Sequence, residues 1–275
     1  MKYSCCLYEK GNESLAQAEI AMLALYLKRA DLKDGMRILD LGCGWGSGAL
    51  YYAEMLPNSQ ITAFSNSRTQ KLYIDQQALD RGFKNLKVIT GDVVDYEFEP
   101  GSFDRAVSIE LFEHMKNYEL LMRKISVWLK DSGKLFVHLF CHKDTPYDFD
   151  GGWMSDHFFT GGTMPSADLL LFFQKNLAIE QQWWVSGKHY AKTSEVCENS
   201  PVTSLQLLIC AARRIGERRW WSRRNRFGRI LWKPMAKRKP LSGSTGGRYS
   251  TWHAPSCLPS EVEILGAYLI ISSLK

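Results

Sequence analysis

Three titratable side chains, Glu110, Glu113 and His114, stand close together in the stretch "SIELFEHMKNYE" at residues 108–119. A carboxylate or an imidazole within hydrogen-bond reach of an amine can accept its proton. Carboxylates also attract a cationic amine and offset the positive charge left on its nitrogen. At positions i, i+3 and i+4, the three groups share one face if the turn is helical. Taken alone, the cluster is more typical of a helix start whose acids suit the helix dipole, and chemistry at a basic substrate is the alternative that its place in the fold must favour.

A glycine-rich turn offers a second candidate site. Asp40, Gly42, Gly44 and Gly46 form the stretch "DLGCGWG", which follows an apolar run and opens a predicted helix. Glycines allow positive φ and a close approach of the backbone to a ligand, and the N-terminus of a helix presents free N–H groups. The third glycine comes one residue too early for a G-x-G-x-x-G dinucleotide fingerprint. We therefore expect a turn that binds some other ligand, with a purely structural turn as the alternative.

Alternating strands and helices must position both groups of residues. This alternation predicts right-handed βαβ units and a mostly parallel, twisted sheet with helices on both faces, which is an α/β, Rossmann-like fold. Ligands bind such sheets at the carboxyl ends of the strands, and Glu110 ends the fourth predicted strand. Strands are predicted at 37–41, 59–65, 85–92, 102–110 and 134–140, and helices at 13–30, 48–54, 67–82 and 118–133.

The alternation loosens after residue 140. Residues 141–165 form a long loop whose glycines and large apolar groups favour a lid over disorder. Its side chains Trp153, Phe158, Phe159 and Met164 offer an apolar wall for a substrate, with plain packing as the alternative.

Regular structure returns briefly beyond this loop. A Ser-capped helix is predicted at 166–175 and a strand at 177–185, with the pair Trp183 and Trp184 expected in the core. Near the end of the chain, "EILGAYLIISSL" is the only late stretch with the pattern of a strand. It offers a substitute for the last strand of the sheet, and the alternative is a chance match.

The composition suits one α/β domain with a sizeable core, since 45% of the 275 residues are hydrophobic. The seven cysteines form no C-x-x-C pair, so no metal site or disulfide framework is expected, and a reducing compartment is favoured. The start lacks the apolar stretch of a signal peptide. No apolar run approaches the roughly 20 residues of a membrane span. These features predict a cytoplasmic protein without a transmembrane segment.

The basic charge is concentrated in one segment. Between Arg213 and Lys239 there are 12 basic residues and one acidic residue, which leaves 23 basic against 28 acidic residues elsewhere. From about Val196 the sequence mixes Arg pairs, Trp pairs, Gly and Pro without a period, which predicts a poorly ordered Arg/Trp-rich tail. Such a tail can instead bind anionic partners such as phosphates or a membrane surface, although no specific nucleic acid is expected.

Two motifs resemble those of class I S-adenosylmethionine (SAM)-dependent methyltransferases. "ILDLGCGWGS" is similar to their motif I, and "NLKVITGDVVDY" is similar to the segment after their third strand, which meets the adenine. Most such enzymes hold the ribose with an acid, whereas this chain has Asn66 and Gln70 at that place. The stretch "YSCC" resembles a segment that caps bound SAM. By this resemblance the residues that bind SAM are Tyr3, Ser4, Asp40, Gly42, Gly44, Asn66, Gln70, Asp92 and Val93.

Longer stretches narrow the resemblance to one group. "DRAVSIELFEHMKNYE", "FFTGGTMPSADLLLFFQ" and "GKHYAKTSE" resemble plant coclaurine N-methyltransferases of the cyclopropane-fatty-acid synthase-like group. The resemblance covers residues 1 to about 195. It implies that Glu110, Glu113 and His114 act on a secondary amine of a benzylisoquinoline-type or other small molecule. Bacterial cyclopropane synthases are similar at "FEH" but usually have Gly in place of Glu110, so Glu110 favours an amine substrate.

The chain is expected to divide into three parts: an N-terminal helical segment at 1–35, a SAM-dependent methyltransferase domain at 36–195 and the tail at 196–275. The resembling enzymes carry a further N-terminal region, and the tail resembles nothing in them. Residues from about Val196 are therefore hypothesised not to be family sequence. Two alternatives stay open: methylene transfer to an unsaturated acyl lipid, and an inactive truncated product with a basic tail. A homodimer is a further expectation.

Overall fold

The computed structural model describes residues 2, 4–148, 161–199 and 264–273 of the chain. Residues 1–196 and 263–275 form one compact unit, to which the following description applies. The helices are α1 (Leu15–Arg29), α2 (Ser47–Met55), α3 (Arg68–Asp80), α4 (Tyr118–Trp128) and α6 (Lys188–Asn199), with 3₁₀ helices η1 (Phe112–His114) and η2 (Leu169–Phe172). The strands are β1 (Arg37–Leu41), β2 (Gln60–Ser65), β3 (Leu86–Thr90), β4 (Phe103–Ile109), β5 (Leu129–His142), β6 (Tyr147–Asp148), β7 (Thr163–Met164), β8 (Leu177–Ser186) and β9 (Ile264–Ser273).

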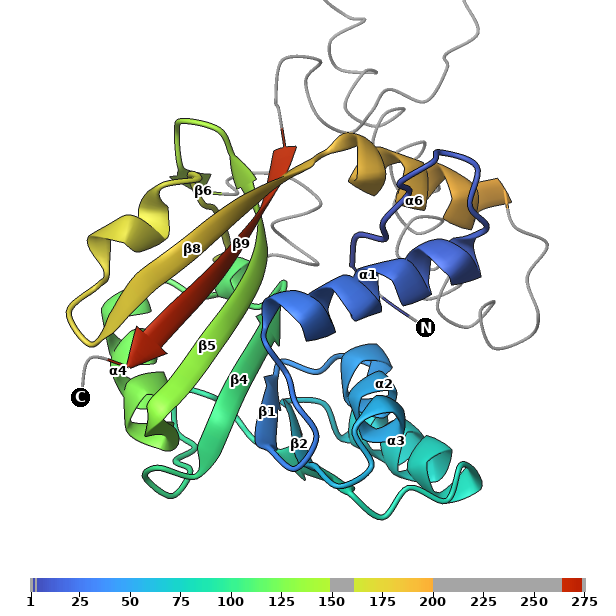
Figure 1. Cartoon of the computed structure of the whole chain (residues 1–275). Coiled ribbons are helices and arrows are strands. Elements are labelled where there is room, and N and C mark those ends of the chain that lie inside the picture. Colours follow the sequence, from blue (N-terminus) through green and yellow to red (C-terminus); the bar gives the residue numbers. More distant parts are fainter. Residues whose placement is uncertain (1, 3, 149–160, 200–263, 274–275) are drawn as a thin grey trace, which may run out of the picture. The chain divides into compact units, whose positions relative to one another are not determined.

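A seven-stranded sheet forms the centre of this unit (Figure 1). Its strand order is β3-β2-β1-β4-β5-β9-β8. Strands β1 to β5 run parallel, whereas β9 runs antiparallel to both β5 and β8. The order reverses between β1 and β4, and open α/β sheets bind ligands at such a switch point. The predicted α/β fold with a mostly parallel sheet is confirmed.

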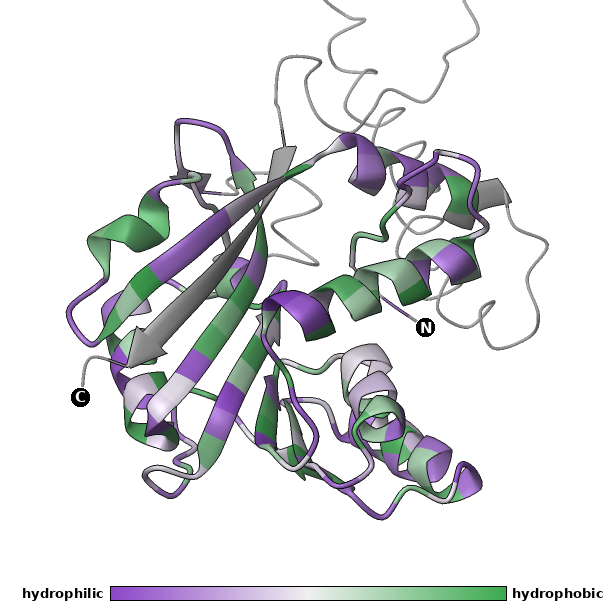
Figure 2. Cartoon of the chain, in the orientation of Figure 1, coloured by the Kyte–Doolittle hydropathy of each residue, from purple (hydrophilic) through white to green (hydrophobic). Residues whose placement is uncertain are grey.

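Helices cover both faces of the sheet, and each face has its own core. One core joins α1, α2 and α3 to the sheet, and the other joins α4 to the opposite face. Neighbouring strand residues alternate between the cores, so that Ile38 belongs to the first and Leu39 to the second. Burial on both faces explains the nearly continuous apolar runs of the parallel strands. Figure 2 shows such a run along β5 and, in contrast, a mainly hydrophilic α6.

Strand β9 comes from the end of the chain. It pairs with β5 over nine register positions and with β8 over nine, so it lies between them in the sheet. This strand lies within the stretch "EILGAYLIISSL", which the sequence offered as a substitute for the last strand. The structure uses it in that way, and without β9 the facing backbone groups of β5 and β8 would lack these partners.

The helix predicted at 118–133 ends earlier than expected. Helix α4 stops at Trp128, and β5 begins at the next residue. The register of β4 and β5 shifts there, which makes residues 130–133 bulge out of the ladder. A Cβ at Gly133 would lie 2.8 Å from the carbonyl oxygen of Lys130. Gly133 therefore permits a tight bulge, and the prediction that it closes the helix was wrong.

Two expectations near the end of the resembling region were also wrong. Ser166 does not cap an α-helix, because it forms a β-bridge with His142 that keeps the chain extended, and only the 3₁₀ helix η2 follows. Trp184 is 50% exposed, and only Trp183 packs against the core. Successive strand residues point to opposite faces, so the two indole rings of one strand cannot both enter the same core.

About half of the expected lid, residues 149–160 of 141–165, lies outside the described residues. Three members of the predicted apolar wall, Trp153, Phe158 and Phe159, fall in that range. The fourth, Met164, is buried in β7. Strands β6 and β7 pair with each other, so the described residues on either side of the gap at 149–160 lie next to each other.

Candidate active site

The glycine turn after β1 has a packed side and an open side. Gly42, Gly44 and Gly46 have φ values of 83°, 53° and 79°, all in the region that favours glycine. A Cβ at Gly46 would lie 2.6 Å from Cγ1 of Ile74 on α3, so this glycine permits close packing. A Cβ at Gly44 would meet no heavy atom within 4 Å. At Gly44 the turn thus presents bare backbone to open space, as a ligand-binding turn requires.

Asp40 lies behind this turn, at the end of β1. Its side chain is buried, and its carboxylate accepts a hydrogen bond from the backbone N–H of Ala49 in the first turn of α2. Burial raises the pKa of Asp40 to about 7, and the bond from Ala49 opposes that rise. A Cβ at Gly48 would lie 3.1 Å from the Asp40 carboxylate. Asp40 is therefore packed against the N-terminus of α2, where it orders the turn.

The ends of β2 and β3 add polar groups to the same edge of the sheet, because parallel strands end at a common edge. Asn66 follows β2 and is exposed. Gln70 lies in the first turn of α3, where its side-chain oxygen accepts a hydrogen bond from the Ser65 hydroxyl at 2.5 Å. Asp92 follows β3, accepts a hydrogen bond from a backbone N–H two residues on at 2.9 Å, and precedes the half-buried Val93.

A buried lysine ties the segment after β3 to α4. Nζ of Lys124 donates to the carbonyl oxygen of Val94 at 2.6 Å and pairs with Glu97 at 2.8 Å. Nε1 of Trp128 donates to the other carboxylate oxygen of Glu97 at 3.1 Å. The hydrogen bond from Lys124 lowers the pKa of Glu97. Lys124 was not among the predicted site residues, although it stands three residues after Leu121 and four before Trp128, on the apolar stripe of α4.

Glu110 stands directly after β4 in a left-handed backbone conformation, with φ of 50°. Its N–H donates to the carbonyl oxygen of His138 on β5 at 2.8 Å. One of its carboxylate oxygens accepts a hydrogen bond from the N–H of Cys5 at 3.2 Å. A neighbouring strand and the N-terminal segment thus hold Glu110 in a conformation that non-glycine residues rarely adopt.

The three predicted catalytic side chains do not share one helical face. Glu110 lies outside the turn, which comprises only η1. Glu113 is fully buried, and one of its oxygens accepts a hydrogen bond from the N–H of Phe140 at 2.8 Å. Its other oxygen has no hydrogen-bond partner within the described part of the chain. His114 is exposed.

Burial controls the protonation of this cluster. Loss of solvent, assisted by the charge of Glu110, raises the pKa of Glu113 well above its ordinary value. The protonated form of Glu113 is therefore favoured. The ring of His114 reaches the surface, yet partial loss of solvent lowers its pKa, which favours the neutral imidazole. The site thus combines a buried acid that retains its proton, a neutral imidazole and the Glu110 carboxyl group.

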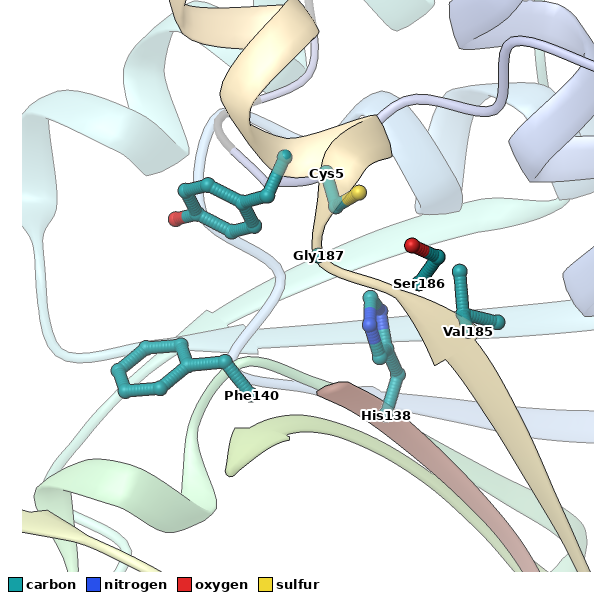
Figure 3. Close-up of a pocket in the computed structure, with 7 residues that line it drawn as sticks. Cys5, His138, Phe140, Val185, Ser186 and Gly187 are labelled. Atoms are coloured by element: carbon teal, nitrogen blue, oxygen red, sulfur yellow. The ribbon is translucent and has the colours of Figure 1, made fainter. Parts of the chain in front are cut away.

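The N-terminal segment covers this cluster. Residues 4–8, here called the strap, are all buried, and the hydroxyl of Ser4 accepts a hydrogen bond from Nζ of Lys2. Tyr3 lies outside the described residues. A small pocket lies beside the strap (Figure 3). Two residues that line it, Cys5 and Phe140, donate their backbone N–H groups to the carboxyl groups of Glu110 and Glu113. The pocket is lined by Cys5, His138, Phe140, Val185, Ser186, Gly187 and Tyr190.

A sheet with this order, a glycine turn after β1 and polar groups at the carboxyl edge define a class I methyltransferase fold. Residues 1–206 match the family model described as "Mycolic acid cyclopropane synthetase". The chain belongs to this family. The resemblance to coclaurine N-methyltransferases is confirmed by the relatives described next.

Several relatives are similar over the same region. The (S)-coclaurine N-methyltransferase of Thalictrum flavum subsp. glaucum is 43% identical over 201 residues, which cover 71% of this chain and 55% of that enzyme. The cyclopropane-fatty-acyl-phospholipid synthase of Escherichia coli (strain K12) is 31% identical over 196 residues, covering 70% of this chain and 49% of the synthase. The chain thus spans about half the length of the curated relatives it matches.

Solved structures agree with this placement. A crystal structure of coclaurine N-methyltransferase bound to N-methylheliamine and SAH has a TM-score of 0.67 and 41% identity, covering 71% of this chain and 59% of that one. The cyclopropane synthase MmaA2 from Mycobacterium tuberculosis has a TM-score of 0.68 at 18% identity, covering 99% of this chain and 90% of that one. At that identity the second likeness supports the fold alone.

Proposed function

We propose that the chain is a SAM-dependent methyltransferase that methylates a secondary amine of a benzylisoquinoline-type small molecule. The observation that carries the proposal is the position of Glu110, a carboxyl group at the carboxyl end of β4 beside the switch point of the sheet. The identity of 43% to (S)-coclaurine N-methyltransferase supports the substrate class. That relative and the solved coclaurine N-methyltransferase together support an amine over a lipid.

The residues at the carboxyl edge fit SAM. Open backbone at Gly44 suits the methionine end, and Asn66 and Gln70 suit the ribose hydroxyls. Asp92 and Val93 suit the adenine, because they combine a carboxylate with a half-buried apolar side chain. When bound, SAM would supply a methyl group on a sulfonium, whose bond to sulfur would break as the amine nitrogen bonds to the methyl carbon, with the neutral thioether as leaving group. Lys124 fixes the segment after β3, and so holds the adenine side of the site in place.

In the proposed mechanism, Glu110 binds the substrate amine and accepts its ammonium proton, which frees the nitrogen lone pair. Glu113 stays protonated in its buried place and limits the negative charge of the carboxyl pair. The exposed His114 passes the proton from the site to solvent. Once this proton has left, Glu110 is again a carboxylate and offsets the positive charge on the methylated nitrogen.

A second candidate function is methylene transfer to an unsaturated acyl lipid. The family match and the 31% identity to the Escherichia coli synthase favour it. Glu110 argues against it, since a carboxylate serves an ammonium ion better than an alkene. A third candidate is an inactive product whose tail, residues 196–275, binds anionic partners. An unaltered protein that does not bind SAM, but binds anionic vesicles with an affinity that falls as salt is added, would support this third candidate.

The proposal also includes a cytoplasmic location and a homodimeric assembly. No helix among the residues that the structure describes is long and apolar enough to cross a membrane. Four described cysteines are free thiols, which supports a reducing, cytoplasmic location. A homodimer is the proposed assembly, and its mass in solution tests it by light scattering.

The test of the proposed function is the Glu110→Gln variant, which keeps the size of the side chain and removes its charge. We expect kcat for a benzylisoquinoline amine to fall about 100-fold or more, because proton acceptance is lost. SAM affinity should stay close to that of the unaltered protein. Glu119→Gln is the matched control, since Glu119 is exposed and pairs with Lys175 on the surface. Full activity of Glu110→Gln would refute the assigned role.

A further inference from the structure

The strap is held at four consecutive backbone N–H groups, each by a different acceptor. The N–H of Cys5 donates to Glu110, and that of Cys6 donates to Oγ1 of Thr193 at 3.0 Å. The N–H of Leu7 donates to the carbonyl oxygen of Ala18 at 3.0 Å. The N–H of Tyr8 donates to Nδ1 of His189 at 3.1 Å.

Two of these four acceptors are side chains of α6. Thr193 is buried, and its hydroxyl donates to the carbonyl oxygen of His189 at 2.7 Å while it accepts the N–H of Cys6. This donation fixes the hydroxyl, so its lone pair faces the strap. The ammonium group of Lys192 also lies 5.1 Å from the ring centroid of Tyr8. One face of α6 thus holds the strap by two hydrogen bonds and a cation–π contact.

The strap connects this face of α6 to the catalytic carboxyl group. The N–H of Cys6 bonds to Thr193 and that of Cys5 bonds to Glu110, so the two contacts lie on adjacent residues of the chain. A fixed backbone at Cys6 therefore limits where the N–H of Cys5 can point. Because Glu110 holds a strained backbone conformation, an external bond to its side chain helps to keep it in place.

We propose that α6 positions the strap against Glu110, so that Thr193 and His189 are positioning residues of the amine site. This inference rests on the proposed function of Glu110. By this inference, Thr193 and His189 in the stretch "GKHYAKTSE" position the strap and are not catalytic. Its residues act through the strap, and the last of them with this role, Thr193, precedes the divergent sequence that begins near Val196.

The protonation of His189 agrees with its role as an acceptor. Partial burial lowers its pKa, and the charges of Glu13 and Glu9 oppose that effect. Neutral imidazole has one nitrogen that accepts a hydrogen bond, and the contact with the N–H of Tyr8 requires that this nitrogen is Nδ1.

The experiment compares side chains that keep or remove each acceptor. Thr193→Val removes the hydroxyl at nearly constant volume, whereas Thr193→Ser retains it. His189→Leu removes the acceptor, whereas His189→Asn keeps an oxygen at the δ position. Thr62→Val, on β2, which β1 separates from β4 in the sheet, is the matched control. Hydrogen–deuterium exchange of the peptide that contains residues 4–8 is the first readout, because it requires no methyl transfer.

We expect exchange in this peptide to rise about three- to tenfold in Thr193→Val and His189→Leu, as loss of one hydrogen bond implies. Thr193→Ser, His189→Asn and Thr62→Val should resemble the unaltered protein. In the unaltered background, Thr193→Val should also raise KM for the amine about three- to tenfold with a smaller change in kcat. In a Glu110→Ala background, the same substitution should have no further effect on KM, because the bond that it acts through is gone.

Unchanged exchange in folded Thr193→Val and His189→Leu would overturn the inference. Equal effects of Thr193→Val on KM with and without the Glu110 carboxyl group would overturn it as well. If the unaltered protein methylates no amine, the proposed function fails by that result alone. Exchange of the strap peptide in Glu110→Ala, expected to rise as in Thr193→Val, then still decides whether the strap links α6 to Glu110.

Discussion

At the scale of single residues, Glu110 combines a proposed chemical role with an unfavourable backbone conformation. Its φ of 50° is one that glycine adopts without strain. The resemblance to bacterial cyclopropane synthases leads one to expect glycine at this position. A carboxyl group there therefore costs conformational energy, and the bonds to His138 and Cys5 help to offset that cost. Such strain at a reactive residue is a recurring property of functional sites.

The strain at Glu110 predicts a difference between two variants that both lack the carboxyl group. Glu110→Gly should be more stable than Glu110→Ala by about 1 kcal/mol, because a Cβ is unfavourable at this φ. Both variants should retain only a residual amine methylation, about 100-fold or more below that of the unaltered protein. Urea unfolding of the two proteins measures the difference. An alanine variant as stable as the glycine variant would show that the backbone at this position is not strained.

The buried Glu113 predicts a pH dependence of stability. Its pKa is raised in the folded protein, so the folded state retains a proton that the unfolded state releases. Stability is therefore lost as pH rises above the ordinary pKa of Glu. Glu113→Gln mimics the protonated acid, so its free energy of unfolding relative to the unaltered protein should increase from about pH 5 to about pH 8. Urea unfolding at both pH values, with the exposed Glu119→Gln as control, tests this. A difference that falls with pH would contradict the assignment.

At the scale of elements, the residues of the glycine turn between β1 and α2 have different roles. Gly46 makes room for Ile74, and Gly44 leaves open space for a ligand. Asp40 holds the following helix by its N-terminus. The local pattern of the sequence predicts this turn, because glycines and an apolar run are adjacent in the chain. The pattern does not reveal which glycine packs and which one binds, because that depends on α3.

The different surroundings of Gly44 and Gly46 predict different results for their alanine variants. Gly46→Ala should destabilise the protein by several kcal/mol, because Cβ would lie 2.6 Å from Ile74 at a strained φ. Gly44→Ala should cost only about 1–2 kcal/mol, from the strain of φ. Gly44→Ala should nevertheless weaken SAM binding more than tenfold, since its methyl group occupies the open side. Thermal unfolding and SAM titration separate the two effects. Retained SAM affinity in a folded Gly44→Ala would contradict the placement of the ligand.

Several features of the site could not be predicted from local sequence, for physical reasons. Nothing adjacent to Glu110 indicates positive φ, since the cause is its pairing with β5 and the strap. The bond between Cys6 and Thr193 joins residues 187 positions apart, and no local pattern reports such a contact. Lys124 is the exception, because its place on the apolar stripe of α4 gave a signal that sequence analysis missed.

At the scale of the whole molecule, the family region and the end of the chain share one sheet. The family model ends at residue 206, yet β9 at Ile264–Ser273 lies between β5 and β8. The prediction of a separate tail from residue 196 stays untested as a division of the chain. Its last strand nevertheless supplies hydrogen bonds to two strands of the methyltransferase fold. The strap and the carboxyl cluster lie within the family region, before Val196.

This arrangement predicts that the end of the chain supports the fold. Truncation after Asn199 removes β9 and should lower the unfolding midpoint by more than about 10 °C, or cause aggregation through the exposed strands. Replacement of residues 200–262 by a flexible Gly/Ser linker of matching length keeps β9 and should have a smaller effect. Thermal unfolding of both variants provides the comparison. Equal stability of the truncated and the complete chain would show that β9 contributes nothing.

The measurement that most directly tests the central claim is methyl transfer from radiolabelled SAM to two acceptors in parallel. One acceptor is a benzylisoquinoline secondary amine, and the other is vesicles of an unsaturated phosphatidylglycerol. We expect label on the amine, little label on the lipid and an amine signal lowered about 100-fold or more in Glu110→Gln. Label on the lipid with none on the amine would refute the proposed function, and amine methylation that does not depend on Glu110 would refute the role of this residue.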